Sequence, residues 1–252
     1  MREKDYHLHF SLENNFWYFT LKTAIIRDNI KKLTNKYKNT LHILEVGCGS
    51  GRNLELINKY GTGFGVDNNL IALNLCQKRK LKNLIVGDAN KLPFKNASFD
   101  IVCTFDLLEH LEDDYGCLME FRRTLKKGGY LIISVPAFRI LWGEHDLALG
   151  HKRRYSKTEL IKKISTVGFK LERCTYFNFF IFLPLLIFRK FISSVPKNKI
   201  NIDILHLDFE YKPFLIISNL FFPYIAKLEI ILLRHFNLPW GVSLFSIYKK
   251  VE

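Results

Sequence analysis

Between Leu41 and Val135 the sequence alternates short apolar runs with stretches of helical periodicity, and this alternation restricts the fold more than any other feature. Such alternation is typical of repeated strand–helix–strand units, which form a parallel sheet covered by helices. Five strands are predicted, at residues 41–46, 63–66, 84–86, 99–105 and 130–135. A helix of about residues 107–125 should precede the fifth strand, because Lys126-Lys-Gly-Gly129 supplies basic residues and a glycine stop.

The remainder of the chain continues this pattern and then interrupts it. Ser156 and Glu159 form a capping box that predicts a helix to Val167, and two further strands are expected at residues 169–177 and 242–248. The stretches 177–188 and 213–226 between them are almost wholly apolar, but each contains proline and neither reaches the roughly 20 residues that cross a bilayer. We expect either a helical hairpin packed on the sheet or, as the preferred interpretation, a hairpin lying in one membrane leaflet.

These patterns predict an α/β fold with three parts. An N-terminal helical and aromatic segment covers residues 1–40, and the α/β domain covers residues 41–177 and 238–252. The apolar insertion, residues 178–237, separates the two pieces of that domain. The sequence shows no signal peptide, and its five cysteines are dispersed without a Cys-x-x-Cys pair, which favours reduced thiols in a cytoplasmic protein.

The net charge of +14 favours an acidic partner or surface, although a generally basic proteome would also explain it. Nucleic acid and an anionic membrane are the two candidates. The basic pair Arg189 and Lys190 borders the most apolar stretch of the chain, an arrangement that membrane-surface proteins use and nucleic-acid binders seldom do. We therefore expect a peripheral protein on the inner face of the cell membrane, and no nucleic acid as partner.

The segment Ile43-Leu-Glu-Val-Gly-Cys-Gly-Ser-Gly51 carries the strongest chemical signal. Its glycines directly follow a strand and permit a tight turn with close backbone approach to a ligand. A nicotinamide fingerprint would space the glycines differently and would place a small residue where Arg52 stands. Asp67, Asp88 and Asp106 then follow the next three strands, at the ligand-binding edge of such a sheet, where the first could hold both ribose hydroxyls of a nucleoside.

This constellation resembles the class I S-adenosylmethionine-dependent methyltransferases of the type-11 group, through the glycine loop and through Gly87-Asp-Ala89, Leu92-Pro-Phe94, Phe99-Asp-Ile-Val102 and Leu108-Glu-His-Leu111. The resemblance implies a Rossmann-like sheet of seven strands, mostly parallel with an antiparallel last strand, and a reaction that needs no metal. S-adenosyl-L-methionine is the implied cofactor. The candidate cofactor residues are Trp17, Glu45, Gly47, Cys48, Gly49, Gly51, Asp67, Asn68, Asp88, Ala89, Phe105 and Asp106.

Three further segments resemble a membrane-associated bacterial and archaeal subgroup of that family. They are Asn15-Phe-Trp-Tyr18, the stretch from Trp142 to Tyr155, and Leu238-Pro-Trp-Gly-Val-Ser-Leu-Phe245. The second of them is rich in groups that could place an anionic methyl acceptor just before a helix N-terminus. A solvated basic turn is the competing interpretation. The candidate acceptor-site residues there are His145, His151, Lys152, Arg153, Arg154 and Tyr155.

His110 is the other catalytic candidate, either as a base or as a residue that orients its loop. The function expected from these features is methyl transfer at a membrane surface to an anionic, lipid-linked acceptor such as a polyisoprenyl phosphate. Two alternatives remain: a small-molecule, sugar or quinone-type O- or C-methyltransferase, and a non-catalytic binding module of a membrane complex. The sequence predicts neither the atom that is methylated nor the oligomeric state.

Overall fold

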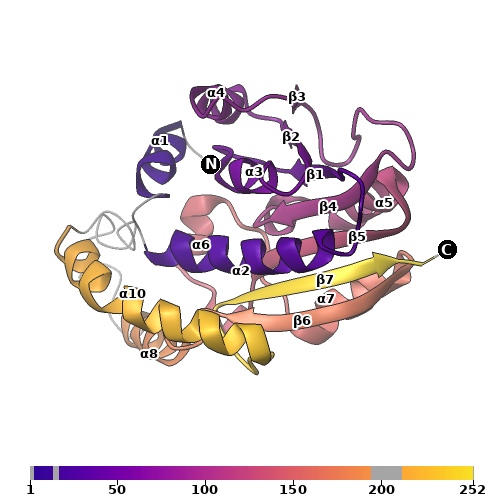
Figure 1. The fold of residues 1–252 in the computed structure, drawn as a ribbon. Coiled ribbons are helices and arrows are strands. Elements are labelled where there is room, and N and C mark those ends of the chain that lie inside the picture. The colour runs from indigo at the N-terminus through magenta and orange to yellow at the C-terminus, as the bar shows by residue number, and fades with distance from the viewer. Residues whose placement is uncertain (1–2, 14–16, 194–211, 252) are drawn as a thin grey trace.

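A computed structural model describes residues 3–13, 17–193 and 212–251 (Figure 1). One seven-stranded sheet runs through it in the order β3-β2-β1-β4-β5-β7-β6. Every neighbouring pair is parallel except those of β7, which is antiparallel to both β5 and β6. The strands are β1 (His42–Val46), β2 (Thr62–Asp67), β3 (Leu84–Val86), β4 (Phe99–Phe105), β5 (Leu125–Pro136), β6 (Phe169–Phe177) and β7 (Ser243–Lys250). The predicted Rossmann-like fold is confirmed.

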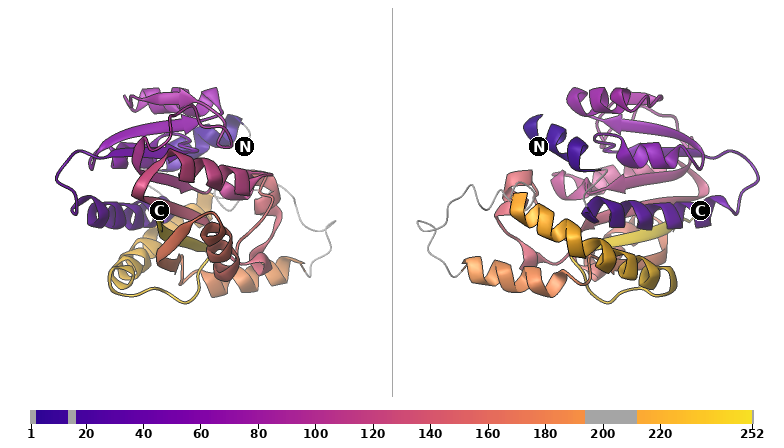
Figure 2. Two further views of the ribbon diagram at one scale, coloured as in Figure 1. Left: turned by 90° about the vertical axis from the view of Figure 1, so that its right-hand side faces the viewer. Right: turned by 60° about the vertical axis from the view of Figure 1, so that its left-hand side comes forward.

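Helices cover both faces of this sheet (Figure 2). Helices α2, α3 and α10 contribute to one apolar core and α5 and α7 to the other, while α4 packs beside β2 and β3. Strand side chains alternate between the cores, as Ile43 and Leu44 do in β1. The helices are α1 (Glu3–Leu12), α2 (Trp17–Thr34), α3 (Arg52–Ile57), α4 (Leu70–Lys78), α5 (Asp114–Thr124), α6 (Glu144–Leu149), α7 (Lys157–Thr166), α8 (Phe182–Ser193) and α10 (Lys212–His235), with 3₁₀ turns η1 (Leu108–His110) and η2 (Arg139–Leu141).

Two boundaries differ from those expected around the fifth strand. The single helix predicted over about 107–125 is divided into η1 and α5, because the Asp113 carboxylate accepts the Gly116 N–H at 2.8 Å and starts a new helix there. Strand β5 begins at Leu125 rather than 130, since Leu125 already pairs with Phe99 across an irregularity in the ladder. The Ser156 cap is confirmed: its hydroxyl accepts the Glu159 N–H at 3.2 Å.

The antiparallel β7 determines where the insertion emerges. Strand β6 ends at Phe177 and β7 begins at Ser243, and these two residues pair at the carboxyl edge of the sheet. The chain between them therefore leaves and re-enters the sheet at that edge. Helix α10 returns along α2 and β6, as Figure 1 shows. Residues 194–211 of the predicted insertion lie outside the described residues.

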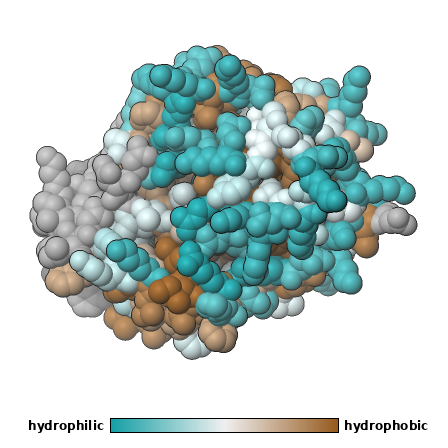
Figure 3. All heavy atoms as spheres, in the orientation of Figure 1, coloured by the Kyte–Doolittle hydropathy of each residue, from teal (hydrophilic) through white to brown (hydrophobic). Residues whose placement is uncertain are grey.

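Helix α10 has one buried side and one exposed apolar side. Ala226, Glu229 and Leu233 are buried against the fold, which agrees with the packed-hairpin interpretation for that side. The opposite side exposes Phe221, Tyr224, Leu228 and Ile231, and hydrophobic residues gather over α10 in Figure 3. Within the described ranges, no helix combines the length and the apolar character that crossing a membrane requires.

The entry into β7 allows no side chain at Gly241. A Cβ there would lie 2.4 Å from the carbonyl oxygen of Phe177, a backbone atom. We expect Gly241→Ala to lower the free energy of unfolding by about 1–3 kcal/mol through overpacking, measured by urea denaturation. Gly143→Ala is the matched control, because its added Cβ would meet only Arg189, at 3.5 Å. A Gly241→Ala loss no larger than that of the control would contradict this view of the β6–β7 corner.

Candidate functional site

The loop after β1 has a conformation that requires glycine. Gly47, Gly49 and Gly51 have φ angles of 74°, 52° and 83°, in the left-handed region that side chains disfavour. The N–H groups of Gly47 and Cys48 both donate to the Val66 carbonyl, at 2.8 and 3.1 Å, and fasten the loop to the end of β2. The backbone of this loop is thereby presented at the carboxyl edge of the sheet, as the sequence predicts.

Asp67, the last residue of β2, is joined to that loop. One carboxylate oxygen accepts the Gly49 N–H and the other accepts the Asn69 N–H, both at 2.9 Å. Burial raises the pKa of Asp67, and these backbone hydrogen bonds, with that of Asn68, oppose the rise. A carboxylate oxygen accepts more than one hydrogen bond, so Asp67 can organise the loop and still receive the hydroxyls of a ribose. The Asn68 side chain is exposed.

Glu45 of β1 is a buried carboxylate with an incomplete set of partners. One oxygen accepts a hydrogen bond from Asn53 at 3.1 Å, whereas the other has no hydrogen-bond partner among the described residues. Burial raises the pKa of Glu45 to about 8. A buried acceptor left without a donor is costly, and the ammonium group of a methionine moiety would supply one. Glu45 thus fits the cofactor that the resemblance implies.

The third and fourth strands add their carboxylates to the same edge. Asp88 is exposed and accepts the Asn90 N–H at 2.9 Å, which leaves it at the rim beside the buried Ala89. Phe105 is buried at the end of β4, and Asp106 follows it with a φ of 56°. The glycine loop after β1, Asp67 at the end of β2 and Asp88 after β3 therefore lie at the carboxyl edge of the sheet. Asp106, which follows β4, lies at the same edge.

Asp106 has a cationic partner that sequence reasoning missed. Lys22 of α2 approaches one Asp106 oxygen at 2.5 Å, and the Ser134 hydroxyl donates to the other at 2.9 Å. Burial alone would raise the pKa of Asp106, but Lys22 and Ser134 lower it, so this carboxylate is ionised. Lys22 lies 84 positions away in the sequence, and no local pattern links the two residues.

Asp146 of α6 is the centre of a second buried network. Its carboxylate meets the Nδ1 of His151 at 2.9 Å, the Nε of Arg154 at 2.7 Å and a guanidinium nitrogen of Arg189 at 3.2 Å. Burial alone would raise the pKa of Asp146, but these three neighbours hold it far below its usual range. The Asp146 interaction fixes the orientation of the His151 ring, which meets the His110 ring edge to face at 4.8 Å.

His110 is neutral at physiological pH. Burial, together with the neighbouring His151, lowers the pKa of His110 to about 4. An uncharged imidazole has a lone pair that can accept a proton or bind a cation. Both chemical roles therefore remain open to it.

The predicted arginine fork for an anion is corrected by the structure. Arg154 is buried and donates to Asp146 and to the Ala137 carbonyl, so its guanidinium group is committed to the interior. Arg153 lies 3.0 Å from Asp114 and donates to the Glu112 carbonyl. The two guanidinium groups therefore do not face a common ligand.

The other acceptor-site candidates are also dispersed. Tyr155 is buried, and its hydroxyl donates to Asp114 at 2.7 Å, a structural contact. Lys152 pairs with Glu112. His145 is half-buried on α6 and is not part of the His110–His151 pair. Trp17 stacks on Phe222 of α10 at 4.8 Å and so meets the insertion, while Asn15 and Phe16 of its motif lie outside the described residues.

The N-terminal segment supplies a further part of the site that the motifs did not reveal. The Ser50 hydroxyl donates to the Glu13 carboxylate, whose two oxygens lie 2.5 and 2.6 Å from the Ser50 Oγ, and Glu13 pairs with Arg79 at 2.8 Å. Burial and the nearby Asp67 raise the pKa of Tyr6 of α1 to about 12. The segment before α2 therefore covers the glycine loop. Its acidic anchor, Glu13, belongs to no recognisable motif.

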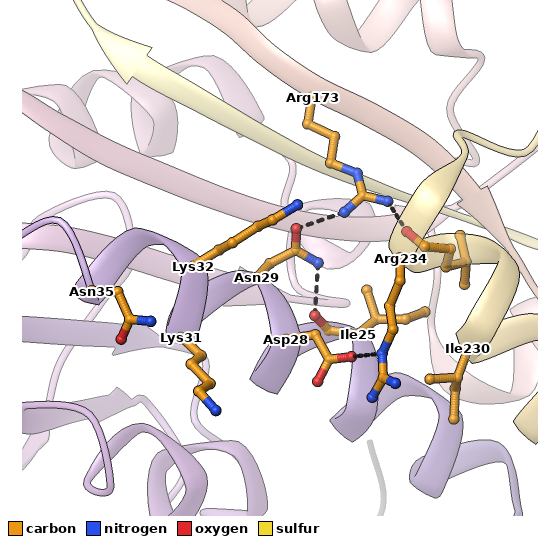
Figure 4. Close-up of a pocket in the computed structure, with 10 residues that line it drawn as sticks. Ile25, Asp28, Asn29, Lys31, Lys32, Asn35, Arg173, Ile230 and Arg234 are labelled. Carbon is orange, nitrogen blue, oxygen red and sulfur yellow. Dashed lines mark hydrogen bonds and ion pairs between the residues drawn. The ribbon is translucent and has the colours of Figure 1, made fainter.

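Figure 4 shows a pocket elsewhere, on the side of the sheet where α2, β6 and α10 meet. Its two arginines have protein partners: Arg173 donates to Asn29 at 2.8 Å and Arg234 to Asp28 at 2.7 Å. None of the predicted cofactor residues lines this pocket. The candidate cofactor residues therefore lie at the carboxyl edge and not in this groove.

The fold and the loop–carboxylate site define a nucleoside-binding α/β protein, and comparison with known proteins specifies the class. Residues 44–133 match the family described as the methyltransferase domain. A Mycolicibacterium smegmatis protein, described as a probable S-adenosylmethionine-dependent methyltransferase, is 30% identical over 135 residues, which are 52% of each chain. An uncharacterised protein of Methanocaldococcus jannaschii is 34% identical over 166 residues, covering 64% of this chain and 68% of its own.

A solved structure shares the fold over the entire chain. Phosphoethanolamine N-methyltransferase 2 of Haemonchus contortus, in complex with S-adenosyl-L-methionine, superimposes with a TM-score of 0.63 at 17% identity, over 100% of this chain and 58% of that one. The chain belongs to the class I S-adenosylmethionine-dependent methyltransferases, and S-adenosyl-L-methionine is its cofactor. The matched region spans about half the length of the Mycolicibacterium relative.

Removal of the Asp67 carboxylate tests the ribose contact. We expect Asp67→Ala to weaken S-adenosyl-L-methionine binding by at least tenfold, because charge-assisted hydrogen bonds contribute about 1.5–3 kcal/mol each. Calorimetric titration of the folded variant measures this. Asp28→Ala, which removes a carboxylate from α2 beside Arg234, is the control. An unchanged dissociation constant for Asp67→Ala would remove this residue from the cofactor site.

The raised pKa of Glu45 predicts a pH-dependent stability. Below pH 4.5, its ordinary pKa, the carboxyl group is neutral in both the folded and the unfolded protein. In the folded protein the pKa is raised to about 8, so ionisation between these pH values favours the unfolded state. The stability of the wild type relative to Glu45→Gln should therefore fall as pH rises from 5 to 8. Urea denaturation without cofactor, at both pH values, measures the difference. Glu172→Gln, an exposed site, should show no such trend; a pH-independent difference for Glu45→Gln would contradict the prediction.

Proposed function

We propose that this chain transfers the methyl group of S-adenosyl-L-methionine to an anionic, lipid-linked oxygen acceptor presented at an anionic membrane surface, as expected for the membrane-associated subgroup. A polyisoprenyl phosphate is the acceptor class that we would test. The observation that carries this proposal is the exposed apolar side of the insertion, which adjoins the edge where the cofactor site lies.

The exposed apolar residues come from both described helices of the insertion. Such a concentration of large side chains is unusual for a surface that faces only water. The net charge of +14 would add attraction to anionic headgroups. The exposed large hydrophobic residues of this surface are Leu183, Ile187 and Phe188 of α8, Phe221, Tyr224, Leu228 and Ile231 of α10, and Phe236 and Trp240 beyond it.

The insertion is joined directly to the reacting edge. Arg189 of α8 reaches Asp146, the residue that orients His151. On the other side, Trp17 at the start of α2 stacks on Phe222 of α10. An acceptor whose chain lay along the apolar side would therefore enter close to Asp106 and His110. This proximity supports a lipid-linked acceptor over a freely diffusing one.

For methyl transfer, the protein needs mainly to align the two reactants and to exclude water. The bound cofactor supplies a sulfonium methyl group, which transfers by in-line displacement. Asp67 and Glu45 would hold the cofactor, and the Lys22–Asp106 pair would close the site behind it. A phosphate oxygen is already anionic and needs no base. A hydroxyl acceptor would need one, and in the small-molecule alternative His110 is the candidate, although its lowered pKa makes it a weak base.

Binding and turnover on vesicles test the proposal together. We expect the protein to cosediment with vesicles that contain anionic lipid, to be released in part by salt, and to methylate a polyisoprenyl phosphate embedded in them. Leu228→Glu should reduce cosedimentation and turnover at least tenfold, because it places a charge on the apolar side. Met119→Glu, at an exposed apolar site on α5, is the matched control and should change neither.

Two results would contradict the proposal. Equally weak binding to anionic and neutral vesicles would remove the membrane surface and leave the exposed side as a protein interface. Vesicle binding without methyl transfer to the phosphate, combined with transfer to a soluble phenol or sugar, would favour the small-molecule alternative.

A further inference from the structure

Glu109 is a buried carboxylate that the cofactor site does not use. It lies on η1 with 0% of its surface exposed, and, apart from its own backbone N–H, neither carboxylate oxygen has a hydrogen-bond partner among the described residues. The nearby cations are committed elsewhere: Lys22 pairs with Asp106, and Arg154 pairs with Asp146. A buried carboxylate without partners is rare, because removing it from water is costly. The site therefore lacks a positive group.

Two imidazoles stand next to this carboxylate. One ligand atom each from Glu109, His110 and His151 lies within 4.8 Å of the other two. The two histidines come from separate segments, η1 and the loop after α6, so the cluster is not a product of sequence proximity alone. Two nitrogen donors and one carboxylate oxygen are a common ligand set for divalent transition-metal ions.

Both imidazoles have outer partners of the kind that metal-binding histidines have. His151 uses its Nδ1 toward the Asp146 carboxylate, which leaves Nε2 as the nitrogen that can bind a cation. His110 has a hydrogen bond to the backbone of Gly150. In each ring one nitrogen is thus held by the protein and the other remains available as a ligand.

We propose that Glu109, His110 and His151 bind a divalent transition-metal ion such as Zn²⁺. Ligand atoms around a tetrahedral zinc ion lie roughly 3.4 Å apart, since each bond is about 2.0–2.1 Å. Side-chain rotations that shorten these separations, from at most 4.8 Å to roughly 3.4 Å, would complete that geometry. The ion supplies the positive charge that Glu109 lacks.

Three protein ligands leave at least one coordination position open. Asp106 interacts electrostatically with both Glu109 and His110, so the cluster lies near the proposed cofactor site, and the open position would bind an anionic oxygen of the acceptor. This role rests on the proposed function. Metal binding itself does not, because it is measured without cofactor and without acceptor. A failure of metal binding is therefore distinguishable from a failure of methyl transfer at a membrane surface.

The test is titration of the chelator-treated full chain with Zn²⁺. We expect one ion to bind per chain, and Co²⁺ to give a visible absorption spectrum of a site with nitrogen and oxygen ligands. Glu109→Gln and His151→Ala should each weaken Zn²⁺ binding at least tenfold. His42→Ala, an exposed histidine at the amino end of β1, is the matched control and should bind like the wild type.

Thermal unfolding separates a lost site from a lost fold. Without metal, Glu109→Gln should unfold at about the same temperature as the wild type, because glutamine keeps the size and shape of the buried side chain. Zn²⁺ should raise the unfolding temperature of the wild type and not that of the variant. His110→Asn replaces Glu109→Gln if the latter fails to fold. Absence of one-to-one binding by the wild type, or undiminished binding by folded Glu109 and His151 variants, would overturn the proposal.

Discussion

The reversed direction of β7 is the constraint on which the layout of this protein depends. A parallel strand at that position would have required its preceding connection to return to the amino edge of the sheet. Because β7 runs antiparallel between β5 and β6, Phe177 and Ser243 face each other at the carboxyl edge. The insertion is thus placed beside the cofactor by topology alone, independently of its own packing.

A single buried charge then ties the insertion to the site. Asp146 holds an imidazole and two guanidinium groups, one of which, Arg189, belongs to α8. Removing one partner of a buried ion pair typically costs about 3–5 kcal/mol, since the remaining charge is left unpaired. The position of His151 therefore depends on an interaction that also fixes the start of the insertion. Acceptor-side geometry and insertion packing are coupled through this carboxylate.

The elements and residues that could be predicted from sequence are those with local causes. The glycine loop and the strand ends at Asp67 and Asp88 follow from residues within a few positions, and the cap at Ser156 likewise. The single helix over 107–125 was wrong because a side chain at Asp113 starts a helix within a pattern that appeared continuous. Contacts between side chains that are far apart in the sequence could not be predicted, because no local pattern of residues indicates them.

The arginines illustrate that second limit. Arg153 and Arg154 are adjacent in sequence and were expected to share a ligand, yet they project into different surroundings and pair with Asp114 and Asp146. A cluster of cationic residues in sequence indicates charge, but burial decides whether that charge is presented to a ligand or neutralised. The Lys22–Asp106 and Glu13–Ser50 contacts were missed for the same reason, because each joins the N-terminal helices to a distant loop.

The Lys22–Asp106 pair joins residues 44–133, which match the methyltransferase family, to a helix outside that match. Residues 44–133 contain the glycine loop, Asp67 and Asp106, but Lys22 precedes that region and His151 with Asp146 follows it. The family core therefore carries the candidate nucleoside-binding groups, whereas its flanks carry the cationic partner of Asp106 and the Asp146–His151 pair. The match over residues 44–133 therefore does not by itself define the methyl acceptor, because the groups that would surround that acceptor come in part from the flanks.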